Sequence, residues 1–172
     1  MDDQAFTSFY KYEFNGRIQQ HSVGINKRGE LFYTVIFLPD SVTNQLPLKK
    51  YPRLRVEGEM HDLPFQGALQ PAKGRWYLLL SQRFLKENHL SLGNEIDVRF
   101  NIGDQDHVEM PIELQQALDA HEAAKALWNT FTPGKKRGFA TTVSSAKRAE
   151  TRQTRAEKMI QYILEGKNPG GR

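Results

Sequence analysis

The stretch RLRVEGEM, residues 53–60, decides the fold class of the first part of the chain. Leu54, Val56 and Met60 alternate with charged residues, so a strand here has one apolar face and one polar face. Gly58 falls on the apolar side among these bulky neighbours, which is typical of a sharp bend or a bulge. The stretch therefore predicts a half-buried β-strand that bends at Gly58.

Further stretches before residue 105 have strand patterns. EIDVRFNI, residues 95–102, repeats the alternation. Residues 30–38 and 75–80 are apolar on both faces, so we expect both faces of the sheet to be covered there. The segments 10–14 and 17–25 are weaker candidates. Turns are predicted at Asn15-Gly16, Gly29, His61-Asp62, 70–74 and Gly93-Asn94, and a short helical connection at 81–90. Roughly five to seven short strands at this spacing predict a small barrel or sandwich.

The apolar period changes after Pro111, where it becomes that of an amphipathic helix. We expect His121 to pack against a neighbouring helix, because it falls on the apolar stripe. Thr132 and Pro133 form the N-cap and N1 pair of a second helix, and Gly166 ends a last one. The apolar stripe comprises Leu114, Ala117, Leu118, His121, Ala124, Leu127, Trp128 and Phe131.

Together these elements predict an α+β protein. Its 172 residues suit one domain of average size, or a smaller domain with an appendage. The prediction assigns a small N-terminal β-barrel to residues 1–110, two to three helices to residues 111–168 and a flexible tail to residues 169–172.

The composition excludes several classes of site. The chain has no Cys, so disulfides, thiolate nucleophiles and thiolate metal sites are excluded. Residues 1–10 have no basic n-region followed by an apolar stretch, and no run approaches the roughly 20 apolar residues that span a bilayer. We therefore expect a cytoplasmic protein with no membrane insertion.

Charge is distributed unevenly along the chain. Residues 131–172 contain ten Lys or Arg and three Asp or Glu, a net charge of +7, whereas residues 1–130 have a net charge of −3. On a helical wheel of residues 146–165 the cations occupy one sector. Like charges three or four residues apart each cost on the order of 0.2–0.5 kcal/mol in an isolated helix, so the crowding favours an anionic neighbour. The basic sector comprises Lys147, Arg148, Thr151, Arg152, Arg155 and Lys158.

Two main explanations of this crowding stay open, beside a protein partner or cations that are simply solvated. In the internal one, acidic residues from the first part of the chain form ordinary salt bridges with the arginines. In the external one, the partner is a phosphate-bearing ligand or a nucleic acid. Lys135, Lys136 and Arg137 support the external explanation, because cations on the first turn of a helix oppose its dipole. Their stretch, PGKKRG, lacks the P-loop pattern, and a solvated corner is the alternative.

Local motifs of catalysis or metal binding do not occur. HEAAK, residues 121–125, begins like the zincin helix motif but has Lys125 where the second His must stand. There is no GxSxG or SxxK nucleophile motif, and we interpret Asp104 and Asp106 as a polar turn. The sequence therefore predicts no catalytic residue, no metal and no cofactor. An aromatic run that could stack bases is interpreted as core; it comprises Phe6, Phe9, Tyr10, Tyr12 and Phe14.

The C-terminal stretch AKRAETRQTRAEKMIQYILEGK resembles the signature of the bacterial YdeI/OmpD-associated, or bacteriocin-protection, proteins. Upstream, VEGEMHDLPFQGALQP, LGNEIDVRF and VEMPIELQQAL are similar to the domain of unknown function that often precedes that signature. Thr142 stands where this family commonly has Trp, Ala149 where Pro is frequent, and Ile163 in place of a Leu. The matching positions are Ala146, Lys147, Glu150, Thr151, Arg152, Arg155, Gly166 and Lys167.

The resemblance implies a double-split β-barrel, and it brings no enzymatic activity, cofactor or catalytic residue. Names in the family mention bacteriocin protection and an outer-membrane porin by association. We therefore expect a non-enzymatic binding protein of stress or bacteriocin tolerance, whose partner is an anionic ligand or a nucleic acid. A small-molecule-binding barrel or enzyme, and a protein-interaction adaptor, are the alternatives. No pattern predicts the oligomeric state.

Overall fold

The computed structural model describes residues 9–172, which form two compact units divided after Asp104. The first, called the β unit, covers residues 9–104, and the second, called the helical unit, covers residues 105–172. Each unit has its own hydrophobic core, with Phe100 fully buried in the first and Phe139 in the second. Each unit therefore folds around side chains of its own.

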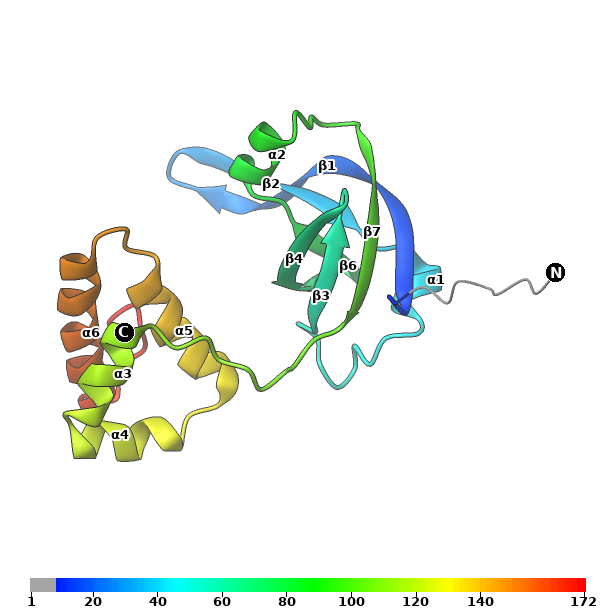
Figure 1. Ribbon diagram of the computed structural model, residues 1–172. Helices are drawn as coiled ribbons and strands as arrows, with labels where there is room; N and C mark the ends of the chain where they lie inside the picture. The colour runs from blue at the N-terminus through cyan, green and yellow to red at the C-terminus, as the bar shows by residue number, and fades with distance from the viewer. Residues whose placement is uncertain (1–8) are drawn as a thin grey trace. The chain divides into compact units, whose positions relative to one another are not determined.

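A seven-stranded antiparallel sheet forms the β unit, in the order β4-β3-β7-β1-β2-β6-β5 (Figure 1). Two short helices, α1 (Asp40–Thr43) and α2 (Gln82–Glu87), lie in its connections. The strands are β1 (Tyr12–Asn26), β2 (Gly29–Phe37), β3 (Arg55–Met60), β4 (Leu63–Ala68), β5 (Gln70–Ala72), β6 (Arg75–Leu79) and β7 (Glu95–Ile102).

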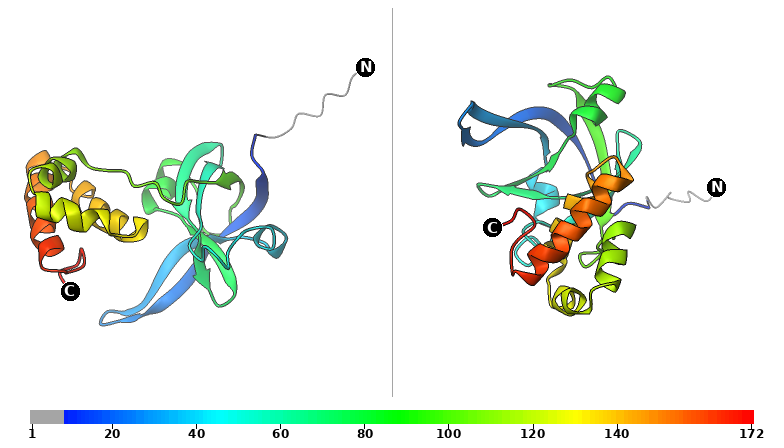
Figure 2. Two further views of the ribbon diagram at one scale, coloured as in Figure 1. Left: turned by 90° about the horizontal axis from the view of Figure 1, so that it is seen from below. Right: turned by 90° about the vertical axis from the view of Figure 1, so that its left-hand side faces the viewer.

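The predicted barrel is not confirmed, because this strongly curved sheet is not closed (Figure 2). Its edge strands β4 and β5 follow one another in the chain but do not pair. Between them only Leu69 intervenes; it is fully buried, and its N–H donates to the carbonyl of Leu54 at 2.9 Å. One buried residue therefore carries the chain from one edge of the sheet to the other.

The turn predicted at Asn15-Gly16 is wrong, because β1 runs through it as one strand. Gly16 pairs with Ile96 of β7, and a Cβ on it would lie 2.6 Å from the Ile36 side chain. Glycine thus makes room for a core side chain here, which a turn pattern cannot show. The prediction also missed β4 and placed all of 70–74 in a turn, although β5 occupies its first half.

No bulge occurs at Gly58, because β3 keeps a regular register with both neighbours there. A Cβ at this position would lie 2.0 Å from the Arg99 carbonyl oxygen and 2.6 Å from Phe100 Cα. The glycine is therefore required by close approach to the backbone of β7 rather than by a bulge.

Four helices form the helical unit: α3 (Ile112–Asp119), α4 (Glu122–Asn129), α5 (Pro133–Ser144) and α6 (Ala149–Leu164). The single helix predicted after Pro111 is thus two helices, α3 and α4, which are separated by Ala120 and His121. His121 has an extended backbone and an exposed side chain, so its predicted packing role is wrong. Because of this break, Leu114 of α3 and Trp128 of α4 are both buried in the same core.

The predicted start of α5 is confirmed, since the Thr132 hydroxyl accepts a hydrogen bond from the Lys135 N–H at 3.3 Å. The chain also breaks before α6, although Ala149 stands where Pro is frequent in the family that the sequence resembles. Ala149 is the first residue of α6, the position that proline favours in helices, and Arg148 before it is extended. Among the described residues, no helix is long and apolar enough to cross a bilayer.

Candidate functional site

The basic sector of α6 divides into two groups of cations. Arg152 and Arg155 are half-buried and hydrogen-bonded inside the helical unit. Lys147, Arg148 and Lys158 are exposed, as is Thr151 among them. The two groups therefore differ in burial and in their hydrogen-bond partners.

Arg152 connects three segments of the helical unit. Its Nε donates to Glu113 of α3 at 2.7 Å, and its Nη1 donates to the carbonyls of Ala146 and Lys147 at 3.3 and 3.1 Å. The Arg152 side chain is 28% exposed and that of Glu113 is 11% exposed. A hydrogen bond from its own backbone N–H, and then Arg152, hold the pKa of the Glu113 carboxyl below its usual value. Arg152 is therefore a structural cross-link between α3 and the start of α6.

Arg155 closes the C-terminal end of α5. Its Nη1 donates to the Thr142 carbonyl at 2.9 Å and to the Ser145 hydroxyl at 2.8 Å. The last carbonyls of a helix have no partner within the helix and carry its negative end charge, so a guanidinium there is favourable. Both arginines of the family signature thus have partners within the unit, only one of which, Glu113, is a carboxylate.

The cations on the first turns of α5 are also placed by the structure. Lys135 Nζ lies 3.8 Å from the ring centroid of Phe131, and Lys136 Nζ lies 5.9 Å from that of Trp128. Arg137 donates from Nη1 to the carbonyls of residues 105 and 107, at 2.9 and 3.1 Å. Arg137 therefore holds the segment that precedes α3, and the two lysines lie against aromatic rings.

Lys147, Arg148 and Lys158 form what we call the basic face of the helical unit. In the described part of the chain, no residue forms an ion pair or hydrogen bond with these three side chains. Lys158 Nζ lies 5.5 Å from the Tyr162 ring centroid. Arg148 is the N-cap of α6 and makes no side-chain capping bond, so the positive end of the helix adds to the face.

A second candidate in the helical unit is a hollow of about 470 Å³ between α3 and α6. Ala117 and Ile160 contribute apolar surface to it, whereas His121 and Glu157 bring an imidazole and a carboxylate. Three glutamines also line the hollow, so it combines apolar surface with several hydrogen-bonding groups, as a site for a small polar ligand would.

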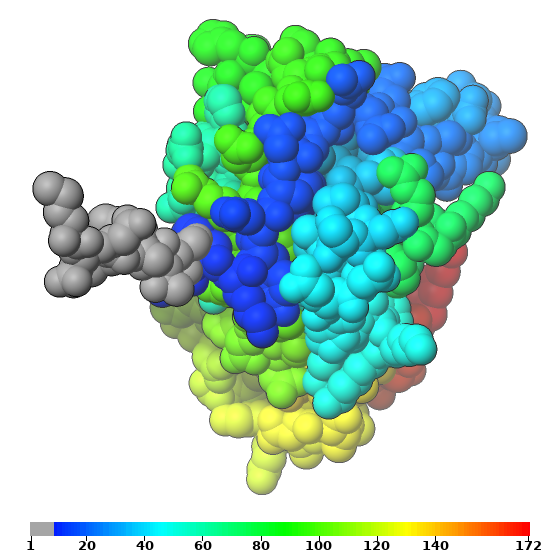
Figure 3. All heavy atoms as spheres, turned by 90° about the vertical axis from the view of Figure 1, so that its right-hand side faces the viewer, coloured from blue at the N-terminus to red at the C-terminus, as the bar shows by residue number. Residues whose placement is uncertain are grey.

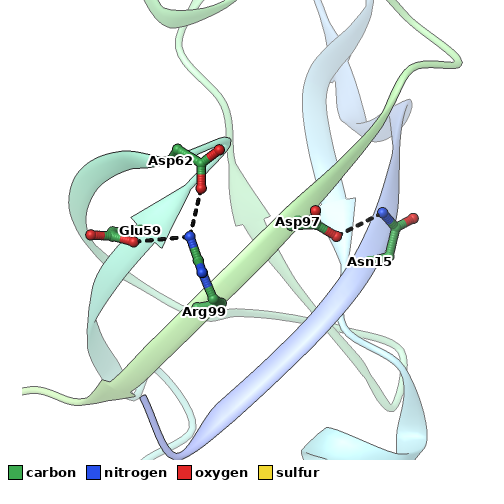
Figure 4. A network of polar contacts seen from close by, with 5 residues as sticks. All are labelled: Asn15, Glu59, Asp62, Asp97 and Arg99. Carbon is green, nitrogen blue, oxygen red and sulfur yellow. Dashed lines mark hydrogen bonds and ion pairs between the residues drawn. The ribbon is translucent and has the colours of Figure 1, made fainter. Parts of the chain in front are cut away.

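A third candidate lies on the β unit, where Arg99 is held by two carboxylates (Figure 4). It pairs with Glu59 at 3.1 Å and with Asp62 at 2.5 Å, while Asn15 donates to Asp97 at 3.0 Å. A hollow of about 500 Å³ adjoins this network. Figure 3 shows the β unit from the side on which β1 lies beside the segment around α1. Since Arg99 is already neutralised, the network has the chemistry of a structural ion cluster.

The remaining predicted residues are not brought together. Tyr12 and Phe14 lie in the core beside Phe100, as expected, whereas Phe9 is exposed, so the core interpretation is wrong for that residue. Phe6 lies outside the described residues. Asp104 and Asp106 are exposed between β7 and α3. Within residues 9–172 no group of three His, Asp or Glu side chains could hold a metal ion.

Sequence reasoning missed an aromatic and cationic cluster on one face of β1, β2 and β6. Its rings come from three strands far apart in the chain, and only the pairing register shows that they share a face. The apolar run at 30–38, interpreted as covered on both sides, was the available signal. Leu31 and Tyr33 of that run are in fact exposed.

Comparison with known proteins gives two matching families and one relative. The family described as Bacteriocin-protection, YdeI or OmpD-Associated matches residues 107–166. The family described as Domain of unknown function (DUF1905) matches residues 14–100. The chain is 39% identical over 75 residues to the Uncharacterized protein YdeI of Bacillus subtilis (strain 168). The aligned residues make up 44% of this chain and 36% of the relative. The match thus spans little more than a third of that relative.

Proposed function

This chain belongs to the YdeI/OmpD-associated family and contains the domain of unknown function DUF1905, and we propose that it is a non-enzymatic protein that binds an anionic partner. The partner binds to the basic face of the helical unit, Lys147, Arg148 and Lys158. A double-split barrel in the β unit, a role in bacteriocin or stress tolerance and a cytoplasmic location belong to the same proposal.

The observation that supports this proposal is the difference between the two groups of cations. Arg152 and Arg155 have acceptors inside the unit, so their contribution to the basic sector is explained by folding. The three cations of the basic face have no such acceptor among the described residues. Like charges near a helix N-terminus repel one another, and a phosphate group removes that repulsion.

The expected affinity depends steeply on salt. Each phosphate that a cation neutralises contributes about −0.9 to the slope of log K against log salt on duplex DNA, so three cations give a slope of about −2.7. Raising the salt fourfold, from about 50 to about 200 mM, then weakens binding by roughly 40-fold. A partner that is recognised by shape or apolar contact would show a much flatter dependence.

Labelled duplex DNA and RNA, titrated with the full chain at these two salt concentrations, test the proposal by fluorescence anisotropy. We expect the triple variant Lys147→Gln, Arg148→Gln, Lys158→Gln to lose most of the binding at low salt. The matched control is Lys49→Gln, Lys50→Gln, Arg53→Gln, which removes the same three charges from exposed positions of the β unit. Absence of binding at low salt, or equal losses in the two triple variants, would refute the proposal.

A second candidate function, binding of a small molecule, is favoured by the hollow between α3 and α6. A ligand that binds only the folded state raises the midpoint of thermal unfolding. A thermal-shift screen against metabolites tests this function, and Ala117→Leu, which fills the hollow, should abolish any shift.

A further inference from the structure

One face of β1, β2 and β6 combines aromatic rings with cations. Residues directly opposite one another in an antiparallel pair lie on the same face. His21 is opposite Tyr33, and Phe37 is opposite Tyr77, so all four side chains share this face. We call it the outer aromatic face, and it comprises Gln19, His21, Leu31, Tyr33, Val35, Phe37, Arg75, Tyr77 and Leu79.

The rings of this face form one connected cluster. His21 lies 5.4 Å from Phe37 and 5.2 Å from Tyr77, and these two rings are 5.6 Å apart, measured between centroids. Arg75 stacks on Phe37 with its guanidinium carbon 3.9 Å from the ring centroid. Val35, on the same face, is fully buried. Contacts on this scale position the rings before any ligand arrives.

Two groups on this face are available to a ligand. Tyr33 is 38% exposed. Arg75 is exposed, and among the described residues no oxygen accepts a hydrogen bond from its guanidinium, which is held only by its stacking on Phe37. A stacked guanidinium keeps its planar set of N–H donors free for a phosphate or a base edge.

Cations lie at both ends of the outer aromatic face, and none of its members is acidic. Lys27 and Arg28 form the β1–β2 turn, where the hairpin projects past its neighbouring strands (Figure 1), while Lys73 lies in the β5–β6 turn beside Arg75. From Gly29 to Phe37 the strand spans about 26 Å at roughly 3.3 Å per residue. The outer aromatic face is therefore an elongated aromatic surface with positive charge at both ends.

The neighbouring part of the sheet has the opposite character. Along β1 the same side continues to Arg17, Asn15 and Glu13, whose β7 partners are Glu95, Asp97 and Arg99. Here the cations are already paired, Arg17 with Glu95 and Arg99 with Glu59 and Asp62. An anionic chain is thus attracted to the outer aromatic face and repelled from the carboxylates beside it.

We propose that the outer aromatic face binds single-stranded nucleic acid, with a base stacked on Tyr33 and phosphates held by Arg75 and the two positive ends. Stacking requires unpaired bases, and each base offers a π-face, so binding is selective for single strands and tolerant of sequence. A lipid surface fits less well, because Gln19, His21 and Arg75 interrupt the apolar residues. The proposal concerns the β unit and does not depend on the basic face of the helical unit.

The test uses the full chain and labelled 12-nucleotide RNA and DNA, with an abasic 12-mer of equal charge as the probe of stacking. Tyr33→Thr removes an exposed ring but keeps a residue that favours strands. Phe32→Thr is the matched control, because Phe32 is the adjacent residue, faces the other side of β2 and is 47% exposed. We expect Tyr33→Thr and Arg75→Gln each to weaken binding of the base-containing strands about tenfold, Phe32→Thr to change it less than about twofold, and the abasic strand to bind weakly.

Three results would overturn the proposal. The first is equal binding of abasic and base-containing strands, which would assign the interaction to charge alone, including that of the basic face. The second is equal losses in Tyr33→Thr and Phe32→Thr. The third is absence of single-strand binding. Tight binding to phosphatidylglycerol vesicles that is lost on replacing Ile25, an exposed residue near the end of β1, by Ser would then assign the face to a lipid surface. A dimer that Tyr33→Thr dissociates would assign it to a second copy of the chain. Loss of binding in the Lys147, Arg148 and Lys158 variant with Tyr33→Thr unaffected would leave only the helical-unit function.

Discussion

Replacing Gly58 by Ala should unfold the β unit selectively, because no side-chain movement can make room for the added methyl group. The Cβ would lie 2.0 Å from the Arg99 carbonyl oxygen, 2.6 Å from Phe100 Cα and 2.9 Å from the Arg99 carbonyl carbon, all of them backbone atoms. An ordinary contact needs at least 3.4 Å, so β3 and β7 would have to separate by more than 1 Å. Overpacking alone costs about 1–3 kcal/mol, and hydrogen bonds lost as the strands separate cost about 1 kcal/mol each. We expect a total of about 3–5 kcal/mol.

Gly67→Ala is the matched control on the neighbouring strand. Gly67 of β4 pairs with Val56 of β3, but the nearest atom to its Cβ would be Leu78 Cδ2 at 3.7 Å, an ordinary contact. Alanine there should change the free energy of unfolding by less than about 1 kcal/mol, and a small stabilisation is expected from the stiffer unfolded chain.

The two tryptophans make the assay specific for each unit, because Trp76 lies in the β unit and Trp128 in the helical unit. Urea unfolding of Gly58→Ala in a Trp128→Phe background, followed by Trp76 fluorescence, reports the β unit. A loss of about 3 kcal/mol lowers the thermal midpoint of a domain of this size by at least roughly 12 °C. If Gly58→Ala stays within about 1 kcal/mol of the wild type, or Gly67→Ala loses as much, the argument from close backbone approach is wrong.

Three further predictions concern the helical unit, followed by Trp128 fluorescence in a Trp76→Phe background. Arg155→Met removes the hydrogen bonds to Thr142 and Ser145, and should lower the free energy of unfolding by about 1–2 kcal/mol in urea; an unchanged urea midpoint would contradict the role of Arg155 at the end of α5. The pKa of Glu113 is lowered by folding, so its contribution to stability is present above its ordinary pKa and is lost as the pH falls through the lowered one; Glu113→Gln should therefore show a smaller drop in urea midpoint between neutral and acidic pH, and parallel pH profiles would count against it. Thr132→Ala removes the cap of α5 and should cost about 1 kcal/mol, whereas Thr154→Ala in the exposed middle of α6 should cost less; the reverse order would show that the cap is not formed in solution.

Local patterns of the sequence determined those elements that depend on near neighbours in the chain. The alternation in 53–60 and 95–102 predicts β3 and β7, and Thr132-Pro133 predicts the start of α5, because strand faces and helix caps require only neighbouring residues. The cationic sector of α6 was equally visible in the sequence, since three- and four-residue spacing defines a helix face.

The tertiary structure decided which partner each of these residues meets. It alone shows that Arg152 pairs with Glu113 of α3 and that the sheet stays open between β4 and β5. It also shows that the Ile36 side chain packs closely against Gly16, and the backbone of β7 against Gly58, so that neither position has room for a Cβ. Strand register likewise brings His21, Phe37 and Tyr77 onto one face. Contacts between residues distant in sequence depend on the packing of the whole unit, and no local period encodes them.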